Sequence, residues 1–189
     1  VDSVVRDQPL QVGFELSNAG DVDVLALPVR VTVHQGADLI DLVGSTVDLP
    51  IDSQLADTFE FDTKTWPTGA LDVQLQIESD VDGIVQWLTL DSGSVLVTEI
   101  LPLSVSYPAY GEHILAGTTQ LRGQSRAGAV VEIELSDGQQ LSTLVGTDGA
   151  FEFERIRVSV GENTYRLRAS DAIGSYSDWL DWLVIGLAG

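Results

Sequence analysis

The stretch VGTDGAFEF, residues 145 to 153, places Asp148 directly before a glycine and two phenylalanines. A carboxylate here could act in acid–base catalysis only with a second carboxylate or a base held at a set distance in a concave pocket. The neighbouring sequence suggests no such partner. Asp followed by Gly supplies the positive φ angles that a tight hairpin needs. We therefore expect Asp148 to turn the chain between two strands and predict no catalytic residue.

The stretch ESDVDG, residues 78 to 83, is the best metal candidate, because Glu78, Asp80 and Asp82 are spaced like alternate ligands of a calcium loop. The position that such a loop fills with a bidentate glutamate is Thr89, and the flanks read as strands instead of helices. NAGDVDV, with Asp21 and Asp23, is equally ambiguous. Solvated acidic turns are the expectation and no metal site or cofactor is predicted, with calcium near Asp80 and Asp82 left open.

Serine catalysis has one sequence candidate, DSGS at residues 91 to 94. The two histidines that could serve as its base are His34, expected on an exposed strand face, and His113, and neither has an orienting context. We interpret DSGS as a turn between the strands IVQWLTL and SVLV. No glycine-rich phosphate loop occurs.

Four tryptophans raise the question of carbohydrate binding, because sugar rings stack on exposed aromatic faces. Trp182 is in phase with apolar neighbours and is expected in the core. Trp179 and Trp66, the latter in the turn TWPTG, could be exposed, and Trp87 is the fourth. Two scattered aromatics do not make a binding platform, so a glycan site is the alternative and not the main prediction.

The charge balance limits the partners. The 189 residues carry 29 acidic and 9 basic side chains, a formal charge of -20, which repels nucleic acid and anionic lipid. Residues 1 to 99 hold 18 acidic and 3 basic residues, and residues 100 to 189 hold 11 and 6, a contrast that suggests two units. The apolar ending WLVIGLAG is far shorter than the ~20 residues of a membrane helix and is expected to be a strand.

Composition also bears on origin. Cysteine is absent, so disulfides and thiol chemistry are excluded, and Lys64 is the sole lysine. An acidic, lysine-poor surface suits a secreted protein or one from a salty habitat. Because methionine is absent, we expect the chain to be a piece of a longer polypeptide.

The dominant pattern along the chain is an alternation of apolar and polar residues, which is typical of half-buried antiparallel strands. Short strands separated by Gly, Asn and Asp predict a β-sandwich, and no window has the helical period. The residues expected to point inward in the first half are Leu10, Val12, Phe14, Leu16, Val29, Val31, Val33, Phe59, Phe61, Leu71, Val73, Leu75 and Ile77. Arg30, Thr32 and His34 are expected outside.

The second half has the same alternation. The inward residues are expected to be Val131, Ile133, Leu135, Phe151, Phe153, Tyr165, Leu167 and Ala169. Arg166 and Arg168 are left outside, where they could pair with Glu132, Glu134, Glu152 or Glu154. Between the halves, TEILPLSVSYP is too apolar for a flexible tether, so we expect the two units to be packed semi-rigidly.

Residues 118 to 174 resemble bacterial Ig-like domains of the glucodextranase domain-B type. The matching features are Gly123 before SRAGAVVEI, the TDGAFEF turn and strand, GENTYRLRASD and the DAIG hairpin. Transthyretin-like carboxypeptidase regulatory domains share the DG.F.F element. Members of these families are usually noncatalytic appendages of surface or secreted proteins, so the resemblance implies that role.

Residues 8 to 97 look more loosely like a CARDB-type adhesion domain, through LQVGFELSNAGDVDV, VRVTVHQG and DTFEFDTKTWPTGALDVQLQIESDVDG. The ending IVQWLTLDSGSVLV departs from that group, which commonly ends rich in Glu and Asn.

The sequence thus predicts an all-β protein of two tandem antiparallel Ig-like or fibronectin-like sandwiches, residues 1–99 and 100–189. We expect a noncatalytic spacer or adhesion segment of a larger prokaryotic protein, extracellular or at the cell surface. Its expected partners are neighbouring domains of the same polypeptide and a surface protein or glycan. The alternative is an accessory carbohydrate-binding module of a glycan-degrading enzyme.

Overall fold

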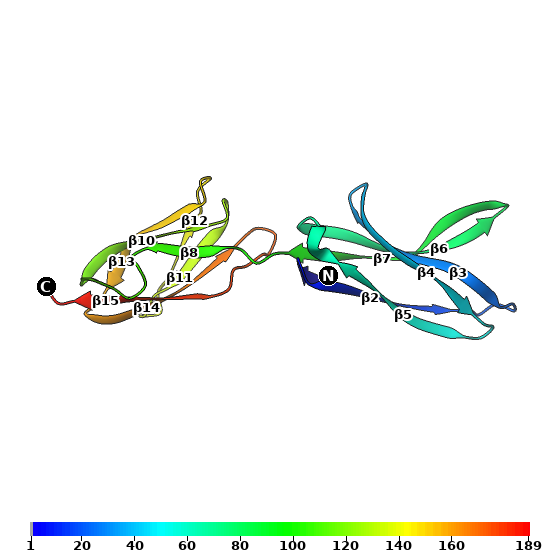
Figure 1. Ribbon diagram of the computed structural model, residues 1–189, viewed down its shortest axis with the longest axis horizontal. Coiled ribbons are helices and arrows are strands. Elements are labelled where there is room, and N and C mark those ends of the chain that lie inside the picture. The colour runs from blue at the N-terminus through cyan, green and yellow to red at the C-terminus, as the bar shows by residue number, and fades with distance from the viewer. Residues whose placement is uncertain (1) are drawn as a thin grey trace. The chain divides into compact units, whose positions relative to one another are not determined.

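The computed structural model describes residues 2 to 189, which form β-strands joined by turns and one short 3₁₀ helix (Figure 1). The chain divides into two compact units, Val1–Thr98 and Glu99–Gly189, and each has a hydrophobic core of its own. The predicted all-β sandwich class is confirmed. No helix among the described residues is long and apolar enough to cross a bilayer.

The first unit packs a five-stranded sheet, in the order β1-β7-β6-β3-β4, against the two-stranded sheet β2-β5. Neighbouring strands are antiparallel except β1 and β7, which run parallel. Its elements are β1 (Asp2–Val5), β2 (Pro9–Ser17), β3 (Val24–Gln35), β4 (Asp38–Leu49), β5 (Gln54–Asp62), η1 (Thr63–Thr65), β6 (Gly69–Val81) and β7 (Ile84–Thr98). The turn η1 carries Lys64, which is exposed and whose backbone N–H donates to Asp62.

The alternating residues fill the first core as predicted. Val29, Val31 and Val33 of β3 are at most 1% exposed, and Phe59 and Phe61 of β5 face them from the smaller sheet. Burial of apolar surface stabilises such a core by about 25 cal/mol per Å². The seam between the two sheets is therefore where most of this unit's stability arises.

Thr32 was expected to face outward with Arg30 and His34, but it is only 2% exposed. It lies on the interior strand β3, opposite Gln74 on one neighbour and Leu42 on the other. Side chains on adjacent strands cover the outer face there, and Arg30 and His34 are themselves half-buried. Alternation in the sequence predicts which face of the sheet a side chain points to, but it does not predict whether side chains on adjacent strands cover it.

The DSGS stretch is not a turn, contrary to our prediction. Residues 91 to 94 lie inside the 15-residue strand β7 and pair with β6. Leu75 pairs with Asp91 and Gln76 with Thr89, so Leu90 is the extra residue of a β-bulge. Because β6 supplies backbone partners throughout, this polar run continues as a strand.

The second unit packs a five-stranded sheet, β12-β11-β14-β15-β9, against a three-stranded sheet, β13-β10-β8. The pair β15 and β9 is parallel and the others are antiparallel. The strands are β8 (Leu103–Tyr107), β9 (Glu112–Leu115), β10 (Gly117–Ser125), β11 (Val130–Glu134), β12 (Gln140–Leu144), β13 (Ala150–Val158), β14 (Gly161–Ser170) and β15 (Leu180–Leu187).

The core of the second unit is more fully enclosed. Tyr165, Leu167 and Ala169 of β14 are 0% exposed, as their alternation predicts. The hydroxyl of Tyr165 donates to the carbonyl of Arg157 at the end of β13, 2.9 Å away. This bond ties strands of the two opposed sheets together, and burial raises the pKa of the Tyr165 phenol to about 12.

The apolar residues of the predicted connector belong to the second unit. Leu101 is 2% exposed in its core, and Leu103 and Val105 pack against the same cluster. Arg126 pairs with Glu99 and lies 3.4 Å from Asp171, which fixes the start of this segment. These contacts explain its apolar composition. Semi-rigid packing of the two units remains a prediction.

Candidate functional site

Asp148 turns the chain, but not within a hairpin. Its Oδ1 accepts the backbone N–H of Ala150 at 3.1 Å, and Gly149 has a φ of 81°, which glycine adopts without strain. The flanking strands β12 and β13 lie in different sheets of the sandwich. The predicted turn is therefore present, and it carries the chain from one sheet to the other instead of joining paired neighbours.

A surface depression of about 520 Å³ lies beside this turn. Asp148 and Glu152 both line it, so a second carboxylate shares this depression with Asp148. The two acids have other partners, however. Glu152 pairs with Arg122 at 3.3 Å, and Asp148 holds the turn. The charged side chains that line the depression, Arg122, Asp148 and Glu152, are thus engaged in local contacts.

The acidic stretch 78 to 83 forms the tip of the β6–β7 hairpin. Val81 pairs with Ile84 across a two-residue turn in which Asp82 and Gly83 have φ angles of 54° and 79°, as a type I′ turn requires. Asp80 Oδ1 accepts the N–H of Gly83 at 2.7 Å. The predicted acidic hairpin is confirmed.

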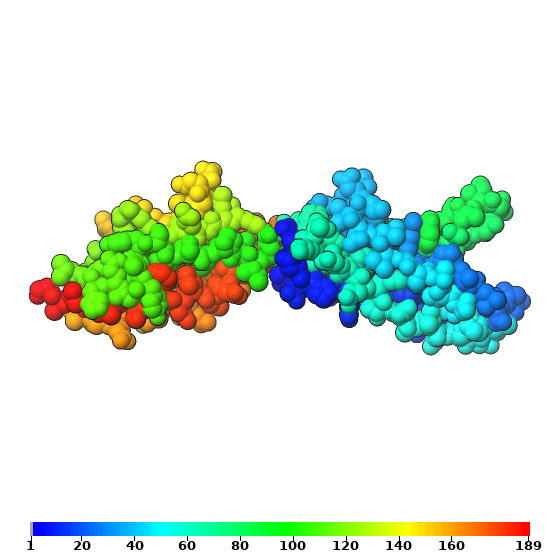
Figure 2. Space-filling model, in the orientation of Figure 1, coloured from blue at the N-terminus to red at the C-terminus, as the bar shows by residue number. Residues whose placement is uncertain are grey.

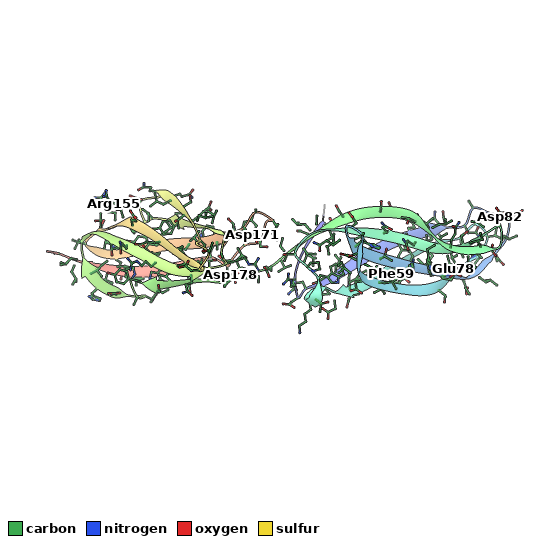
Figure 3. The ribbon with its side chains drawn as sticks, turned by 90° about the horizontal axis from the view of Figure 1, so that it is seen from above. Phe59, Glu78, Asp82, Arg155, Asp171 and Asp178 are labelled. Carbon is green, nitrogen blue, oxygen red and sulfur yellow. The ribbon has the colours of Figure 1, made fainter. Side chains whose placement is uncertain are left out.

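The hairpin extends beyond the rest of the first unit. Figure 2 shows its tip, coloured green, projecting from the blue and cyan parts of that unit. Asp82 lies near the outer end, with Glu78 further back along the hairpin (Figure 3). Among the residues described by the structure, no group of three or more His, Cys, Asp or Glu side chains is arranged to hold a metal ion.

The second acidic stretch also has a structural role. Asp23 Oδ1 accepts the N–H of Ile51 at 2.9 Å, and Asn18 donates to the carbonyls of Val22 and Leu49. These bonds hold the loop between β2 and β3 against the end of β4. The carboxylate of Asp21 is exposed.

One candidate constellation was not anticipated from the sequence. The strand registers place His34 beside Asp72 and Asp72 beside Ser94, so the three lie in one row across β3, β6 and β7. A serine nucleophile needs the histidine as its immediate neighbour, oriented by the acid behind it. Here the acid occupies the middle position, and His113 lies in the other unit, so this order does not assemble a triad.

Trp66 is buried, contrary to the expectation of an exposed turn residue. It is 1% exposed, its ring meets that of Phe61 edge-on at 5.5 Å, and its Nε1–H donates to Asp41 Oδ2 at 3.0 Å. The chain leaves η1 at Trp66 and turns this side chain into the first core. Trp66 is thus no part of an exposed glycan platform.

Two further tryptophans are half-buried. Trp182 packs against the second core as predicted, and its Nε1–H donates to the carbonyl of Pro108. The guanidinium carbon of Arg30 lies 3.8 Å from the ring centroid of Trp87, a cation–π contact on the outer face of the first unit. Both rings are engaged with the protein itself.

Among the tryptophans of the described residues only Trp179 is exposed, with 43% of its surface accessible to solvent. The guanidinium carbons of Arg166 and Arg168 lie 4.7 and 5.4 Å from its ring centroid, and Arg168 lies 4.1 Å from that of Tyr176. Asp181 Oδ1 is 3.7 Å from Arg166 Nε. We call these five residues the aromatic–arginine cluster.

The arginines of this cluster do not follow the predicted glutamate ladder. The register does place Glu134 beside Arg166 and Glu132 beside Arg168. The ion pair of Arg166 is with Asp181, on the other neighbouring strand, and Arg168 lies over aromatic rings. Guanidinium groups stack on aromatic faces because the ring quadrupole attracts the cation. Guanidinium groups therefore lie over the rings of Trp179 and Tyr176, which remain partly exposed.

A groove of about 720 Å³ lies between β2 and β7 in the first unit. Its apolar floor is Leu10, Val12 and Phe14 of β2 with Val73 and Leu75 of β6. Sequence alternation correctly assigned these side chains to the inner face. Alternation could not show that these inner side chains are left uncovered here, because their cover depends on how many strands pair beside β2 in the smaller sheet.

Comparison with known proteins yields no assignment by sequence. No protein-family model matches the chain, and no curated protein is significantly similar to it. The resemblance to glucodextranase domain-B and CARDB domains therefore stays a prediction.

Solved structures share the fold class only at low similarity. The chain is 12% identical to red sea bream transglutaminase (TM-score 0.39, 97% of this chain and 30% of that one). It is 16% identical to the BSP domain of a biofilm-associated protein (TM-score 0.37, 89% of this chain and 28% of that one). It is 13% identical to fibronectin(III)-like modules of Clostridium thermocellum CbhA (TM-score 0.36, 99% of this chain and 90% of that one). The chain thus spans less than a third of the length of the transglutaminase and of the biofilm-associated protein.

Proposed function

We propose that this chain is a noncatalytic structural or adhesion segment of a larger prokaryotic surface or secreted protein, and that it acts as a spacer under mechanical load. The observation that carries the proposal is the parallel pairing of terminal strands. In the first unit β1, the first strand, lies beside β7, the last.

A load applied at the two ends of the first unit pulls β1 and β7 in opposite directions along their length. The register runs from Asp2 beside Val95 to Val5 beside Thr98, and the N–H of Arg6 extends it by donating to Thr98 at 2.7 Å. The ladder bonds between parallel strands are evenly spaced, so this geometry loads them together and not one after another. Val4 and Val97, 8% and 0% exposed, anchor the two strands in the core.

The second unit has a related arrangement at its end. The last strand, β15, lies parallel to β9, from Val184 beside Glu112 to Leu187 beside Leu115. The N–H of Ala116 donates to Leu187 at 2.9 Å and continues the ladder. A pull on the C-terminal end of this unit therefore also acts along a parallel ladder.

The charge of the chain supports the same role. A formal charge of -20 on 189 residues keeps densely spaced copies of a surface segment apart. This repulsion is screened beyond about 8 to 10 Å at physiological salt, so it opposes close association without extending far.

Single-molecule stretching tests the proposal. The substitution Val4→Pro removes one backbone donor from the middle of the β1–β7 ladder, whereas the matched Val4→Ala keeps the donor and removes only side-chain packing. We expect the unfolding force of the first unit to fall more in V4P than in V4A. Equal forces in wild type and both variants would contradict a load-bearing β1–β7 pair.

A second candidate function, binding of an acidic glycan, is supported by the aromatic–arginine cluster alone. Two guanidinium groups beside exposed Trp179 and Tyr176 suit a ligand that carries carboxylate or sulfate groups better than a neutral sugar. Affinity electrophoresis with polygalacturonate and with neutral cellulose derivatives would test it. Retardation by the acidic polymer that disappears in Arg168→Ala would favour this function, and unchanged mobility in both gels would exclude it.

A further inference from the structure

The groove between β2 and β7 is bounded by two strand edges that have no neighbour. In residues 2 to 189, β2 has β5 on one side and nothing paired on the other. The strand β7 has β6 on one side, while β1 covers only Val95–Thr98 on the other. Residues 84 to 94 of β7 thus present an open edge. Such edges carry backbone N–H and C=O groups ready to pair with another strand.

The second unit shows what fills the same place when the sandwich is complete. There β10 lies between β13 and β8 in a three-stranded sheet, whereas β2 in the first unit has only β5. The third strand, β8, is antiparallel to β10 and directs Leu103 and Val105 against the core. Residues 2 to 98 contain no strand in the place that β8 takes beside β10.

The burial of facing residues reflects this difference. Leu121, Phe151 and Phe153 in the three-stranded sheet are 0 to 5% exposed. Leu10, Val12 and Phe14 of β2 are only half-buried and line the groove. Covering apolar surface of this kind is favourable by about 25 cal/mol per Å². The groove therefore offers backbone partners and apolar burial to the same occupant.

Charge selects the occupant further. The charged residues that line the groove are Asp2, Glu15 and Asp91, all of them acidic. A second copy of this chain is itself acidic, with a formal charge of -20 over its 189 residues, and is therefore electrostatically disfavoured at this rim. A segment with lysine or arginine at its ends is electrostatically complementary.

We propose that this groove accepts an extended segment of another polypeptide, which adds a strand antiparallel to β2. The segment carries apolar side chains at alternate positions and basic residues at its ends. Main-chain hydrogen bonds to β2 supply affinity, and the apolar floor selects the alternation, as in other cases of strand addition.

The probe is a synthetic peptide built on β8, acetyl-KKLSVSYKK-amide, titrated into the complete 189-residue chain by calorimetry. Its control, KKSSVLYKK, has the same composition but moves the leucine to the opposite face of the strand, so that only Val and Tyr share a face. We expect the control to bind at least about tenfold more weakly, since it can bury fewer apolar side chains on one face. Equal affinity of the two peptides would overturn strand addition in favour of nonspecific attraction.

Hydrogen exchange locates the bound peptide. Some backbone amides of residues 10 to 16 point away from β5 and toward the groove. Saturating KKLSVSYKK should slow their exchange at least about tenfold, since exchange then requires release of the added strand. Binding that leaves residues 10 to 16 unprotected would contradict this site. Protection of these amides without any peptide, together with a dimer in sedimentation at 100 µM peptide-free protein, would show that a second copy occupies the groove.

A positive charge added to the rim tests its selectivity for charge. Ser92 lines the groove and is exposed, so Ser92→Lys should leave the fold intact. We expect S92K to weaken KKLSVSYKK and to strengthen EELSVSYEE, by about threefold or more each. Thr58→Lys, an exposed β5 position outside the groove lining, is the matched control and should change neither affinity. The same response in both variants would contradict binding in the groove.

Discussion

The ring of Phe151 lies directly on the backbone of Gly123: a Cβ atom at position 123 would meet Phe151 Cζ at 2.4 Å and the carbonyl oxygen of Ser104 at 2.1 Å. Both neighbours are fixed, because Phe151 is 3% exposed in the core and Ser104 belongs to the paired strand β8. The glycine is thus required for close approach and not for its backbone angle.

Gly123→Ala should lower the free energy of unfolding of the second unit by about 1 to 3 kcal/mol or more, since overpacking forces the sheet apart. Hydrogen exchange of amides in residues 99 to 189 measures the loss for this unit alone. Gly93→Ala, on β7 of the first unit, is the control for the glycine-to-alanine change itself, because a Cβ at that strand position meets nothing within 4 Å. Its effect is measured by exchange of the amides in residues 2 to 98. A loss of stability in G123A no larger than the loss in G93A would contradict the close contact.

Tyr165 predicts a loss of stability at high pH. Burial raises the pKa of its phenol from 10.0 to about 12, so between these values the folded state keeps the proton that the unfolded chain releases. The free energy of unfolding should therefore fall as the pH rises from 10 to 12, by at most about 2.7 kcal/mol at ~1.36 kcal/mol per pKa unit. Below pH 10 the group contributes no pH dependence.

Urea unfolding of wild type and Tyr165→Phe isolates this effect from other titrating groups. At pH 8 the variant should be less stable by about 1 kcal/mol, because it loses the hydrogen bond to Arg157. The gap should shrink as the pH rises above 10, since only the wild type has the phenol. A gap that is constant from pH 8 to 11.5 would contradict the raised pKa.

The buried indole of Trp66 depends on Asp41. Asp41→Ala leaves the Nε1–H without its acceptor at a position that is 1% exposed, and should destabilise the first unit by about 1 to 3 kcal/mol. Trp66→Phe removes the donor, so Asp41→Ala should cost less in that background. Additive losses in this double-mutant cycle, measured by urea unfolding, would show that the hydrogen bond has no stabilising effect.

The acidic hairpin predicts indifference to calcium. Asp80 caps the turn by accepting the N–H of Gly83, and the described residues bring no third acidic ligand to it. Calcium at 5 mM should therefore shift the melting temperature of the first unit by less than about 1 °C, since stabilisation requires binding to the folded state. A larger rise that a chelator reverses, and that Asp80→Asn abolishes, would establish a calcium site instead.

The inward faces of most strands could be predicted from alternation, as with Val29, Val31 and Val33. What could not be predicted depended on partners distant in the sequence. Thr32 is buried by the strands on both sides of β3, and DSGS is a strand because β6 pairs along it. The burial of Trp66 could not be predicted from alternation or from turn composition, since the fold brings its partners Asp41 and Phe61 to it.

The same limit applies to the sites. The Asp148 turn could be predicted from its Asp-Gly pair, but not that it joins opposite sheets. The aromatic–arginine cluster combines β14 with residues that lie beyond it in the chain, and no local pattern marks it. The groove arises because β2 has a paired neighbour on one side only among residues 2 to 189, and no residue type in β2 indicates this.

Lys64 is the sole lysine of the chain, exposed on η1 of the first unit. Reagents that acylate amines consequently find one side-chain target in addition to the α-amino group of the chain. Once the α-amino group is blocked, a fluorophore attached in this way reports from a single defined position, and a bead or glass slide bearing such a reagent holds every molecule by the same unit. Site-specific labelling then requires no engineered side chain.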